Sequence, residues 1–249
     1  FRMLNSKGGI NGRKVNLLSL DDGYSPPKTI EQTRKMVEQD EVLAIMNALG
    51  TPTNSATHKY LNQKKVPQLF VNSGANKWGD PKHFPWTIGF TPSYQTEGRA
   101  FAKHILATRP QARVGVLYQN DDLGKDYLKG LLDGLADKAK AMLVSLQTYE
   151  VTDATVDSQV LSLKGSGADT FVNISTPKFA AQAIRRAAES GWKPTQYLAT
   201  VSTSVTAVLK PAGFENGQGV ISSAYLRDPS DPAHLGSKEY QDYAATLKQ

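Results

Sequence analysis

Polar residues gather in short loops that each follow a predicted buried strand. The loops are rich in Gly, Ser, Thr and Asn and lie at residues 50–53, 72–76, 119–125, 175–177 and 200–204. In parallel sheets such loops lead into helix N-termini, whose free N–H groups carry about half a positive charge and attract anions. The Gly-rich run at residues 8–12 precedes a strand instead of following one, so it is typical of a turn and not of a phosphate loop. The pattern therefore favours a carboxylate ligand over a phosphate.

Candidate catalytic groups are few. Asp121, Asp122 and Asp126 could bind Ca²⁺ or act as acid and base, but loop formation and favourable charge at a helix N-terminus explain them better. Ser175 and Lys178 match the S-x-x-K acylase pattern without its companion S-D-N and K-T-G elements. The histidines do not fall at metal-ligand spacing; they are His58, His83, His104 and His234. We expect no catalytic residue, no metal site and no cofactor.

The composition is that of a globular protein. The chain has 249 residues, of which 39% are hydrophobic and 21% charged, and no apolar run approaches the roughly 18 residues that cross a bilayer. The net charge is +6, but the Lys and Arg residues are scattered, so we expect no nucleic-acid partner. Zero cysteines exclude thiol catalysis and disulfides, which is compatible with a periplasmic location.

Short β-branched runs alternate with amphipathic helical stretches along the chain. The runs predict strands at residues 15–20, 42–47, 66–71, 114–118, 143–149, 170–174, 197–199 and 220–225. Such alternation predicts parallel sheets with helices on both faces. A stretch rich in Trp, Pro and Gly at residues 78–92 separates three strands from five, and two Asp-Pro pairs at residues 227–232 indicate a second crossing. We therefore expect an α/β protein with two doubly wound lobes.

The ordered motifs resemble the branched-chain amino acid (Leu/Ile/Val) type of periplasmic binding protein. The resemblance is carried by Gly9-Ile10-Asn11-Gly12-Arg13, Asp21-Asp22, residues 50–53, Val66-Pro67-Gln68, Ser73-Gly74-Ala75, residues 118–124, residues 179–186 and Gly191-Trp192. It implies the type I fold, in which three crossing segments join two lobes that close on a ligand. It also implies a chain that is incomplete at both ends.

The resemblance and the break points together predict three segments. Residues 1–92 would form the N-terminal lobe, without its first strand, and residues 93–226 the C-terminal lobe. Residues 227–249 would form a crossing segment and a helix that returns toward the N-terminal lobe.

The resemblance also carries ligand-binding positions over to this chain. From the first lobe they are Gly50, Thr51, Ser73, Gly74, Ala75 and Asn76. From the second lobe they are Leu123, Thr176, Val201 and Ser202. Tyr94 is a further candidate, because it lies with Trp78 and Trp86 in the segment between the lobes, where core packing is the default and one or two rings could face the cleft.

The second-lobe positions depart from the family pattern. The family usually places a tyrosine where this chain has Leu123, often another aromatic residue where it has Thr176, and an acidic residue near Val201 that receives the ammonium group of an amino acid. A buried ammonium without a carboxylate partner is costly. We therefore expect a ligand with a carboxylate and an apolar or aromatic body, and without an α-amino group.

The function that this resemblance implies is ligand capture in the periplasm for an ABC importer. The partners would be a small carboxylate and a permease in the inner membrane, and we expect a monomer. One alternative is a sensor or receptor domain of the same fold, in which closure signals instead of delivering cargo. Another is a small-molecule enzyme on a Rossmann-like scaffold, with Asp121 and Asp122 near Ser175 and Lys178 as its catalytic cluster.

Overall fold

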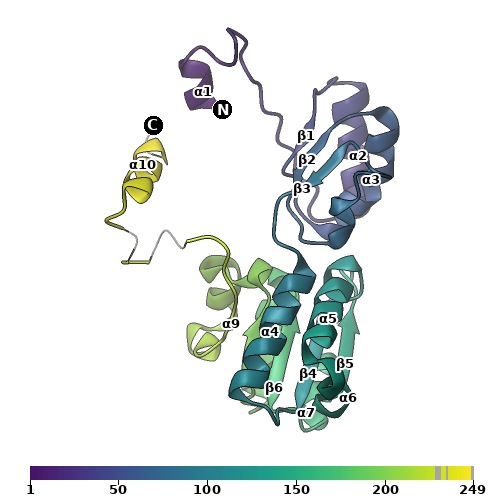
Figure 1. Cartoon of the computed structure of the whole chain (residues 1–249), viewed down its shortest axis with the longest axis vertical. Helices are drawn as coiled ribbons and strands as arrows, with labels where there is room; N and C mark the ends of the chain where they lie inside the picture. The colour runs from purple at the N-terminus through teal and green to yellow at the C-terminus, as the bar shows by residue number, and fades with distance from the viewer. Residues whose placement is uncertain (228–230, 234, 248–249) are drawn as a thin grey trace. The chain divides into compact units, whose positions relative to one another are not determined.

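The computed structural model describes residues 1–227, 231–233 and 235–247 (Figure 1). The chain divides into two compact units, one of Phe1–Gly23 with Ala224–Gln249 and the other of Tyr24–Ser223. The first unit holds the helices α1 (Arg2–Ser6) and α10 (Lys238–Leu247). The second unit holds two separate parallel sheets, as the sequence predicts.

The first sheet is short and has the strand order β1-β2-β3. Its strands are β1 (Ile45–Met46), β2 (Gln68–Val71) and β3 (Thr87–Gly89). Helices α2 (Pro26–Glu38) and α3 (Thr51–Lys64) lie on the same side of it (Figure 1). Pro26 follows Ser25 at the first position of α2, where its missing N–H costs nothing. The 3₁₀-helix η1 (Asn76–Gly79) connects β2 to β3.

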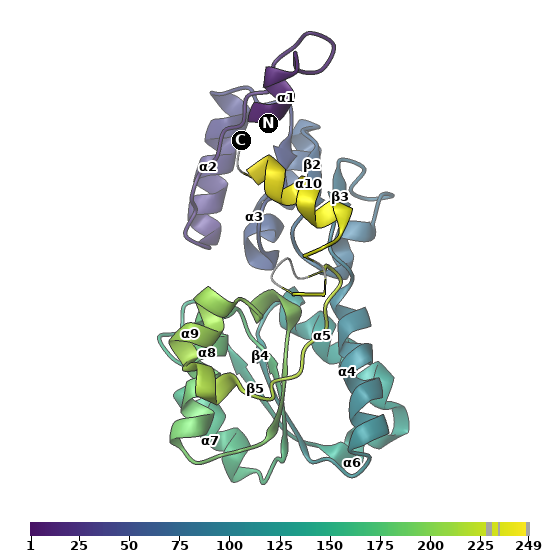
Figure 2. The same cartoon turned by 90° about the vertical axis from the view of Figure 1, so that its left-hand side faces the viewer.

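The second sheet is longer and has the strand order β5-β4-β6-β7. Its strands are β4 (Val114–Gln119), β5 (Leu143–Tyr149), β6 (Thr170–Ile174) and β7 (Thr195–Leu198). The long helices around it are α4 (Tyr94–Thr108), α5 (Asp122–Leu135), α7 (Asp157–Gly165) and α8 (Pro177–Glu189). Figure 2 shows α4 and α5 on one side of this sheet and α7 and α8 on the other.

Several short elements complete the larger unit. They are η2 (Ala136–Lys138), α6 (Ala139–Met142), η3 (Thr200–Ser202), the π-helix η4 (Val205–Leu209), α9 (Lys210–Ala212) and η5 (Phe214–Gly217). The segment η3 directly follows the end of β7, where the sequence predicts a polar loop.

Apolar packing holds the second sheet on both faces. All five residues of β6 are buried. Val172 packs in a cluster with the α5 residues Tyr127 and Leu131, and its neighbour Phe171 packs on the opposite face with Trp192. Burial on both faces explains why the apolar residues Phe171 and Val172 stand next to each other in this strand and do not alternate with exposed polar residues.

Hydrogen bonds between side chains hold the first sheet to α3. The buried Asn54 amide donates to the carbonyl oxygens of Ala48 and Gly50 at 2.9 and 2.7 Å. Its oxygen accepts from Gln68 Nε2 at 2.9 Å, and Gln68 Oε1 accepts from Thr87 Oγ1 at 3.2 Å. Asn54 on α3 is thereby bonded to the end of β1 and to β2, and it is linked to β3 through Gln68.

Three predicted strands differ from the structure, and one observed strand was not predicted. Residues 15–20 form no ladder with any described residue, because a strand needs a paired neighbour that an apolar pattern alone does not supply. Of the strand predicted at residues 42–47, only the two residues of β1 form a strand. Of the strand predicted at residues 220–225, only the bridge from Ile221 to Tyr197 is present. Strand β3 lies inside the segment 78–92, where the sequence predicts a break.

The helix expected at the C-terminal end is present as α10. The residues of the predicted second crossing are only partly described, since positions 228–230 lie outside the described residues. The predicted segments 1–92, 93–226 and 227–249 remain predictions.

Candidate functional site

The loops that follow β1 and β2 meet through a buried pair of hydroxyl groups. Thr51 Oγ1 lies 2.7 Å from Ser73 Oγ, and both side chains are buried. Ser73 Oγ also accepts hydrogen bonds from Trp78 Nε1 at 2.9 Å and from the Ala75 N–H at 3.3 Å. The structure thus brings together Thr51, Ser73 and Ala75, which the resemblance places in one site.

Tyr94 joins this group from the start of α4. Its N–H donates to the Gly74 carbonyl at 2.9 Å, and a Cβ at Gly74 would lie 2.7 Å from the Tyr94 ring. Burial raises the pKa of Tyr94, although hydrogen bonds to Gly74, Ser73 and Thr51 oppose the rise. The ring stacks on Tyr127 with centroids 4.6 Å apart. Glycine at position 74 is what allows the tyrosine to approach so closely.

Asn76 is used for structural contacts. Its N–H donates to Asp126 Oδ2 of α5 at 2.8 Å, and its side-chain oxygen accepts from Ser93. Lys77 beside it donates to Asp122 Oδ2 at 2.9 Å. These contacts tie the loop after β2 to the first turns of α5.

A hydrogen-bonded cluster of side chains lies at the ends of β4, β5 and β6. The Tyr149 hydroxyl accepts from the Thr176 N–H at 2.9 Å and lies 3.2 Å from both Thr176 Oγ1 and Gln119 Oε1. Gln119 Nε2 donates to Asp121 Oδ2 at 2.6 Å. Burial raises the pKa of Tyr149 to about 12 and raises the pKa of Asp121 as well. Of these residues, only Thr176 is among the ligand-binding positions predicted from the sequence.

Tyr24 connects the two groups of loops. Its ring lies against Gly50, where an added Cβ would be 2.4 Å from Tyr24 Cε2. Its phenol is near the side chains of Gln119, Asp121, Tyr94 and Tyr149, all of which influence its pKa. Burial raises the pKa of Tyr24. The sequence does not reveal this residue as part of the site, because nothing in the turn at residues 21–24 indicates where its ring points.

Leu123 and Ser202 lie in buried positions. Leu123 belongs to the apolar cluster that also contains Ala75, Trp78 and Tyr94. Ser202 is fully buried and donates to the Ser175 carbonyl at 2.5 Å. The roles of both residues in ligand binding remain predictions.

Val201 is exposed by 39%. The carboxylate of Glu97, from α4, binds the neighbouring residue Thr200. Glu97 Oε1 accepts from the Thr200 N–H and hydroxyl at 2.8 and 2.9 Å, and Glu97 Oε2 accepts from the Tyr127 hydroxyl at 2.7 Å. The sequence has no acid at residues 199–208, and nothing in it indicates one from so distant a segment. These three hydrogen bonds already occupy both oxygens of the Glu97 carboxylate.

The candidate catalytic groups have structural roles. Asp121 caps α5 by accepting from the N–H groups of Leu123 and Gly124 at 2.9 and 3.4 Å. Lys178 donates to the Asp153 carbonyl at 3.0 Å, and no hydrogen bond or ion pair described for it involves Ser175. Among the described residues, no three His, Asp or Glu side chains gather so that they could hold a metal ion.

The described histidines have separate surroundings. His83 pairs with Asp80 at 2.7 Å, and His104 Nδ1 lies 2.7 Å from the Tyr197 hydroxyl. His58 is buried in the first lobe, stacked on Phe84 with centroids 3.9 Å apart. His234 lies outside the described residues.

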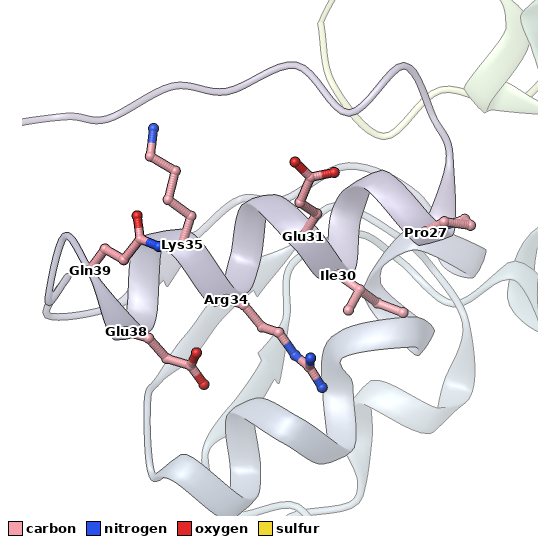
Figure 3. A pocket seen from close by; sticks show the side chains of 7 residues that line it. All are labelled: Pro27, Ile30, Glu31, Arg34, Lys35, Glu38 and Gln39. Carbon is pink, nitrogen blue, oxygen red and sulfur yellow. The ribbon is translucent and has the colours of Figure 1, made fainter.

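A separate hollow of about 540 Å³ lies along α2 (Figure 3). It is lined by Pro27, Ile30, Glu31, Arg34, Lys35, Glu38 and Gln39. None of the predicted ligand-binding residues lines it, and its charged side chains, two acidic and two basic, all come from one helix. We therefore do not assign the predicted carboxylate site to this hollow.

No helix in the described part of the chain is long and apolar enough to cross a membrane. A family model described as "Periplasmic binding protein" matches residues 1–249. The curated relatives include "Leu/Ile/Val-binding protein homolog 7" of Brucella abortus (strain 2308), which is 23% identical over 229 residues. They also include the "Leu/Ile/Val-binding protein" of Escherichia coli (strain K12), which is 21% identical over 218 residues. These alignments cover 89% and 88% of this chain but only 56% and 58% of the two relatives.

Solved structures give the same result for the fold. A substrate-binding periplasmic protein from Ralstonia solanacearum superposes with a TM-score of 0.83 at 25% identity. A possible leucine/isoleucine/valine-binding protein from Rhodopirellula baltica superposes with a TM-score of 0.79 at 22% identity. The matches cover 98% and 97% of this chain and 68% and 65% of those chains. The predicted type I architecture is therefore confirmed.

Proposed function

This chain belongs to the periplasmic binding protein family, and we propose that it binds a small carboxylate between the loops of its two sheets. The ligand would be a branched-chain or other hydrophobic amino acid, or an aromatic acid. The whole protein would deliver it to a permease of an ABC importer. The family consists of binding proteins and not enzymes, as the sequence predicts, and its location is the periplasm.

One observation carries the proposal: polar side chains at the strand ends of both sheets converge on one place. Thr51, Ser73 and Tyr94 form one group, and Gln119 and Tyr149 belong to the other. Tyr24, whose ring lies against Gly50, is also near Gln119, so it stands near both groups. A ligand held here would touch both sheets, and such a ligand favours the closed state over the open one.

The residues of this region suit a carboxylate with an apolar body. Helix α3 begins at Thr51, has 14 residues and has no acidic residue in its first turn, so its N-terminal N–H groups favour an anion. The rings of Tyr24, Tyr94 and Tyr149 supply apolar surface, and their hydroxyl groups supply donors. Such a mixture of apolar surface with a few directed polar groups is typical of small-molecule sites.

An amino acid ligand would also need an acidic partner for its α-ammonium group. The Glu97 carboxylate, which lies beside Val201, already accepts three hydrogen bonds. Asp121 is the other acid near the tyrosines, and burial raises its pKa, which weakens it as a partner for an ammonium group. We therefore favour an acid without an α-amino group, such as an aromatic acid, over leucine.

The experiment is to identify small molecules released from the purified full-length protein by mass spectrometry and to measure melting shifts with leucine, isoleucine, valine and benzoate. At a ligand concentration of about 100 times Kd, binding stabilises the folded state by about 2.7 kcal/mol. A shift with benzoate alone supports an acid without an amino group. Strong shifts with leucine and none with benzoate contradict that choice, and shifts with none of the four contradict the proposed ligand class.

The variant Thr51→Val tests whether the hydroxyl pair takes part. It keeps the shape of the side chain and removes the hydroxyl that lies 2.7 Å from Ser73 Oγ. We expect about a tenfold loss of affinity for whichever acid binds, because one buried hydrogen bond to a charged group contributes about 1.5–3 kcal/mol. The matched control is Thr108→Val, since that hydroxyl is bonded to His104 within α4. Equal affinities of the two variants would argue against a role for Thr51.

A further inference from the structure

Tyr24 occupies an unusual position that the sequence does not assign to the site. It precedes α2, far from the strand ends in sequence, and its backbone has a φ of 58°. Bulky residues rarely adopt this left-handed conformation, because it is strained. Such strain persists only where the surroundings hold the residue in place.

The surroundings of Tyr24 come from both sheets. On the side of the first sheet its ring covers Gly50, which has a φ of 101° and is the N-cap residue just before α3. A Cβ at position 50 would lie 2.4 Å from Tyr24 Cε2 and 2.7 Å from Thr53 Oγ1, so only glycine leaves room for the ring. On the side of the second sheet the phenol is near the Gln119 side chain, which influences its pKa.

The polar partner of Tyr24 is itself part of a fixed network. Gln119 is buried, donates to Asp121 and accepts from the hydroxyls of Tyr149 and Thr176. Tyr94, whose N–H is bonded to Gly74, is also near enough to influence the Tyr24 phenol. The phenol therefore lies between the candidate binding residues of one sheet and those of the other.

We propose that Tyr24 is a specificity-determining residue of the ligand site, whose phenol bridges the two sheets from Gly50 to Gln119 and forms the wall against which the apolar body of the ligand packs. This inference rests on the proposed function for the ligand. The bridge itself is a property of the protein without ligand. Gly50 then acts as a positioning residue, because it makes room for the ring.

The binding test uses the full-length protein with leucine and benzoate as probes. We expect Tyr24→Ala to lower the affinity for the bound probe by at least about tenfold, because it removes a half-buried aromatic ring that would pack against the ligand. Tyr24→Phe keeps the ring, so we expect it to keep most of the affinity. Gly50→Ala should resemble Tyr24→Ala, because its Cβ displaces the ring. Tyr60→Phe is the control, since the Tyr60 hydroxyl bonds Glu38 on α2.

The bridge is tested without ligand by a double-mutant cycle on the equilibrium constant for unfolding. We expect Tyr24→Phe to raise that constant by about threefold to tenfold, as loss of one hydrogen bond does. In a Gln119→Leu background, which lacks the partner, the same substitution should change nothing. An equal effect in both backgrounds would overturn the bridge.

The two tests separate the two claims. If the wild type binds a probe and Tyr24→Ala binds it with the same affinity, the role of Tyr24 is overturned and the proposed function still stands. Binding of neither probe by the wild type would contradict the proposed ligand class, and the cycle would then decide the bridge alone. If Tyr60→Phe lowers the affinity for the probe as much as Tyr24→Ala does, the specific role of Tyr24 is overturned.

Discussion

The two sheets of the larger unit are built from the same kind of strand–helix alternation but are held together differently. In the second sheet, strand β6 is buried along its whole length between two apolar clusters. In the first sheet, α2 and α3 lie on one side, and a hydrogen-bond network around Asn54 and Gln68 joins α3 to the strands. Met46, Phe70 and Ile88, one from each strand, remain exposed by 52%, 43% and 51%.

The backbone shows the same contrast. In the first-sheet region the left-handed conformation occurs at Tyr24, Asn47 and Phe70, among other non-glycine residues, and Phe70 lies where the register between β2 and β3 shifts. In the second-sheet region of the described chain Ala136 has that conformation, outside the strands. We infer that packing fixes the second sheet, whereas directed hydrogen bonds and local strain fix the first. The second sheet should therefore be the more stable and the first the more easily disturbed by changes in polar groups.

The largest effect should come from removing a buried ring of the second sheet. Phe171→Ala in β6 deletes a fully buried side chain, and substitutions of this type cost about 3–5 kcal/mol. Phe70→Ala in the first sheet removes an exposed ring and should cost less than about 1 kcal/mol. Denaturant unfolding of both variants measures the difference. Equal losses would refute the contrast between a packed and a half-covered sheet.

Next in size is the loss of the first-sheet network. Asn54→Ala leaves the Gln68 amide and the carbonyl groups of Ala48 and Gly50 without this partner, which we expect to cost about 2–3 kcal/mol. Asn120→Ala is the control, because Asn120 bonds the exposed Glu150, and it should change stability by less than about 0.5 kcal/mol. If Asn54→Ala cost no more than this control, hydrogen bonds would not be what holds the first sheet.

A smaller effect should appear at acid pH. Burial, helped by the charge of Lys77, lowers the pKa of His58 to about 4 from its ordinary value of 6.5. The unfolded chain therefore takes up a proton at this residue before the folded protein does, so stability is present above pH 6.5 and falls as the pH drops toward 4. A pKa that differs by one between the folded and unfolded states corresponds to about 1.4 kcal/mol. Because solvent screens part of this interaction, we expect a total loss of about 2 kcal/mol.

His58→Phe checks this effect, because it keeps a ring between Phe84 and Trp78 and removes the titrating group. Its unfolding free energy should fall less between pH 7 and pH 4 than that of the wild type. Parallel curves for the two proteins would show that His58 does not titrate differently on folding.

The smallest effect on stability should appear at alkaline pH, at Tyr149 of the second sheet. Burial raises the pKa of Tyr149 to about 12. The unfolded chain loses this proton near pH 10 while the folded protein keeps it, so the contribution is complete below pH 10 and is lost as the pH rises toward 12. We expect the stability difference between wild type and Tyr149→Phe to narrow by about 1 kcal/mol from pH 9 to pH 11. A difference that stays constant over this range would contradict the assignment.

The sequence predicted the second sheet better than the first for the same physical reason. Strands β5 and β6 agree residue for residue with the predicted runs at 143–149 and 170–174. Burial on both faces explains this for β6, whereas β5 is an edge strand that is partly exposed along most of its length. The first sheet has strands of two to four residues, and β3 lies among Pro and Trp residues that indicate a loop. The run at residues 15–20 has the pattern of a strand but no paired neighbour among the described residues.

The arrangement of the candidate site was predictable only where a polar loop follows a strand. The loops after β1 and β2 are evident in the sequence, and the structure brings Thr51, Ser73 and Gly74 together as predicted, whereas their role in ligand binding remains a proposal. Tyr24 and Glu97 could not be found, because their contacts with Gln119 and Thr200 join segments about a hundred residues apart. Such contacts follow from the tertiary arrangement and leave no local pattern.

The most direct measurement is hydrogen–deuterium exchange of the full-length protein with and without the acid that shifts its melting temperature. We predict that added ligand slows exchange at residues 50–53 and 73–76 of the first sheet and, together with them, at residues 119–124 and 175–177 of the second. Slower exchange at the loops of one sheet only, or along the hollow of α2 at residues 27–39, would contradict a ligand held jointly by both sheets.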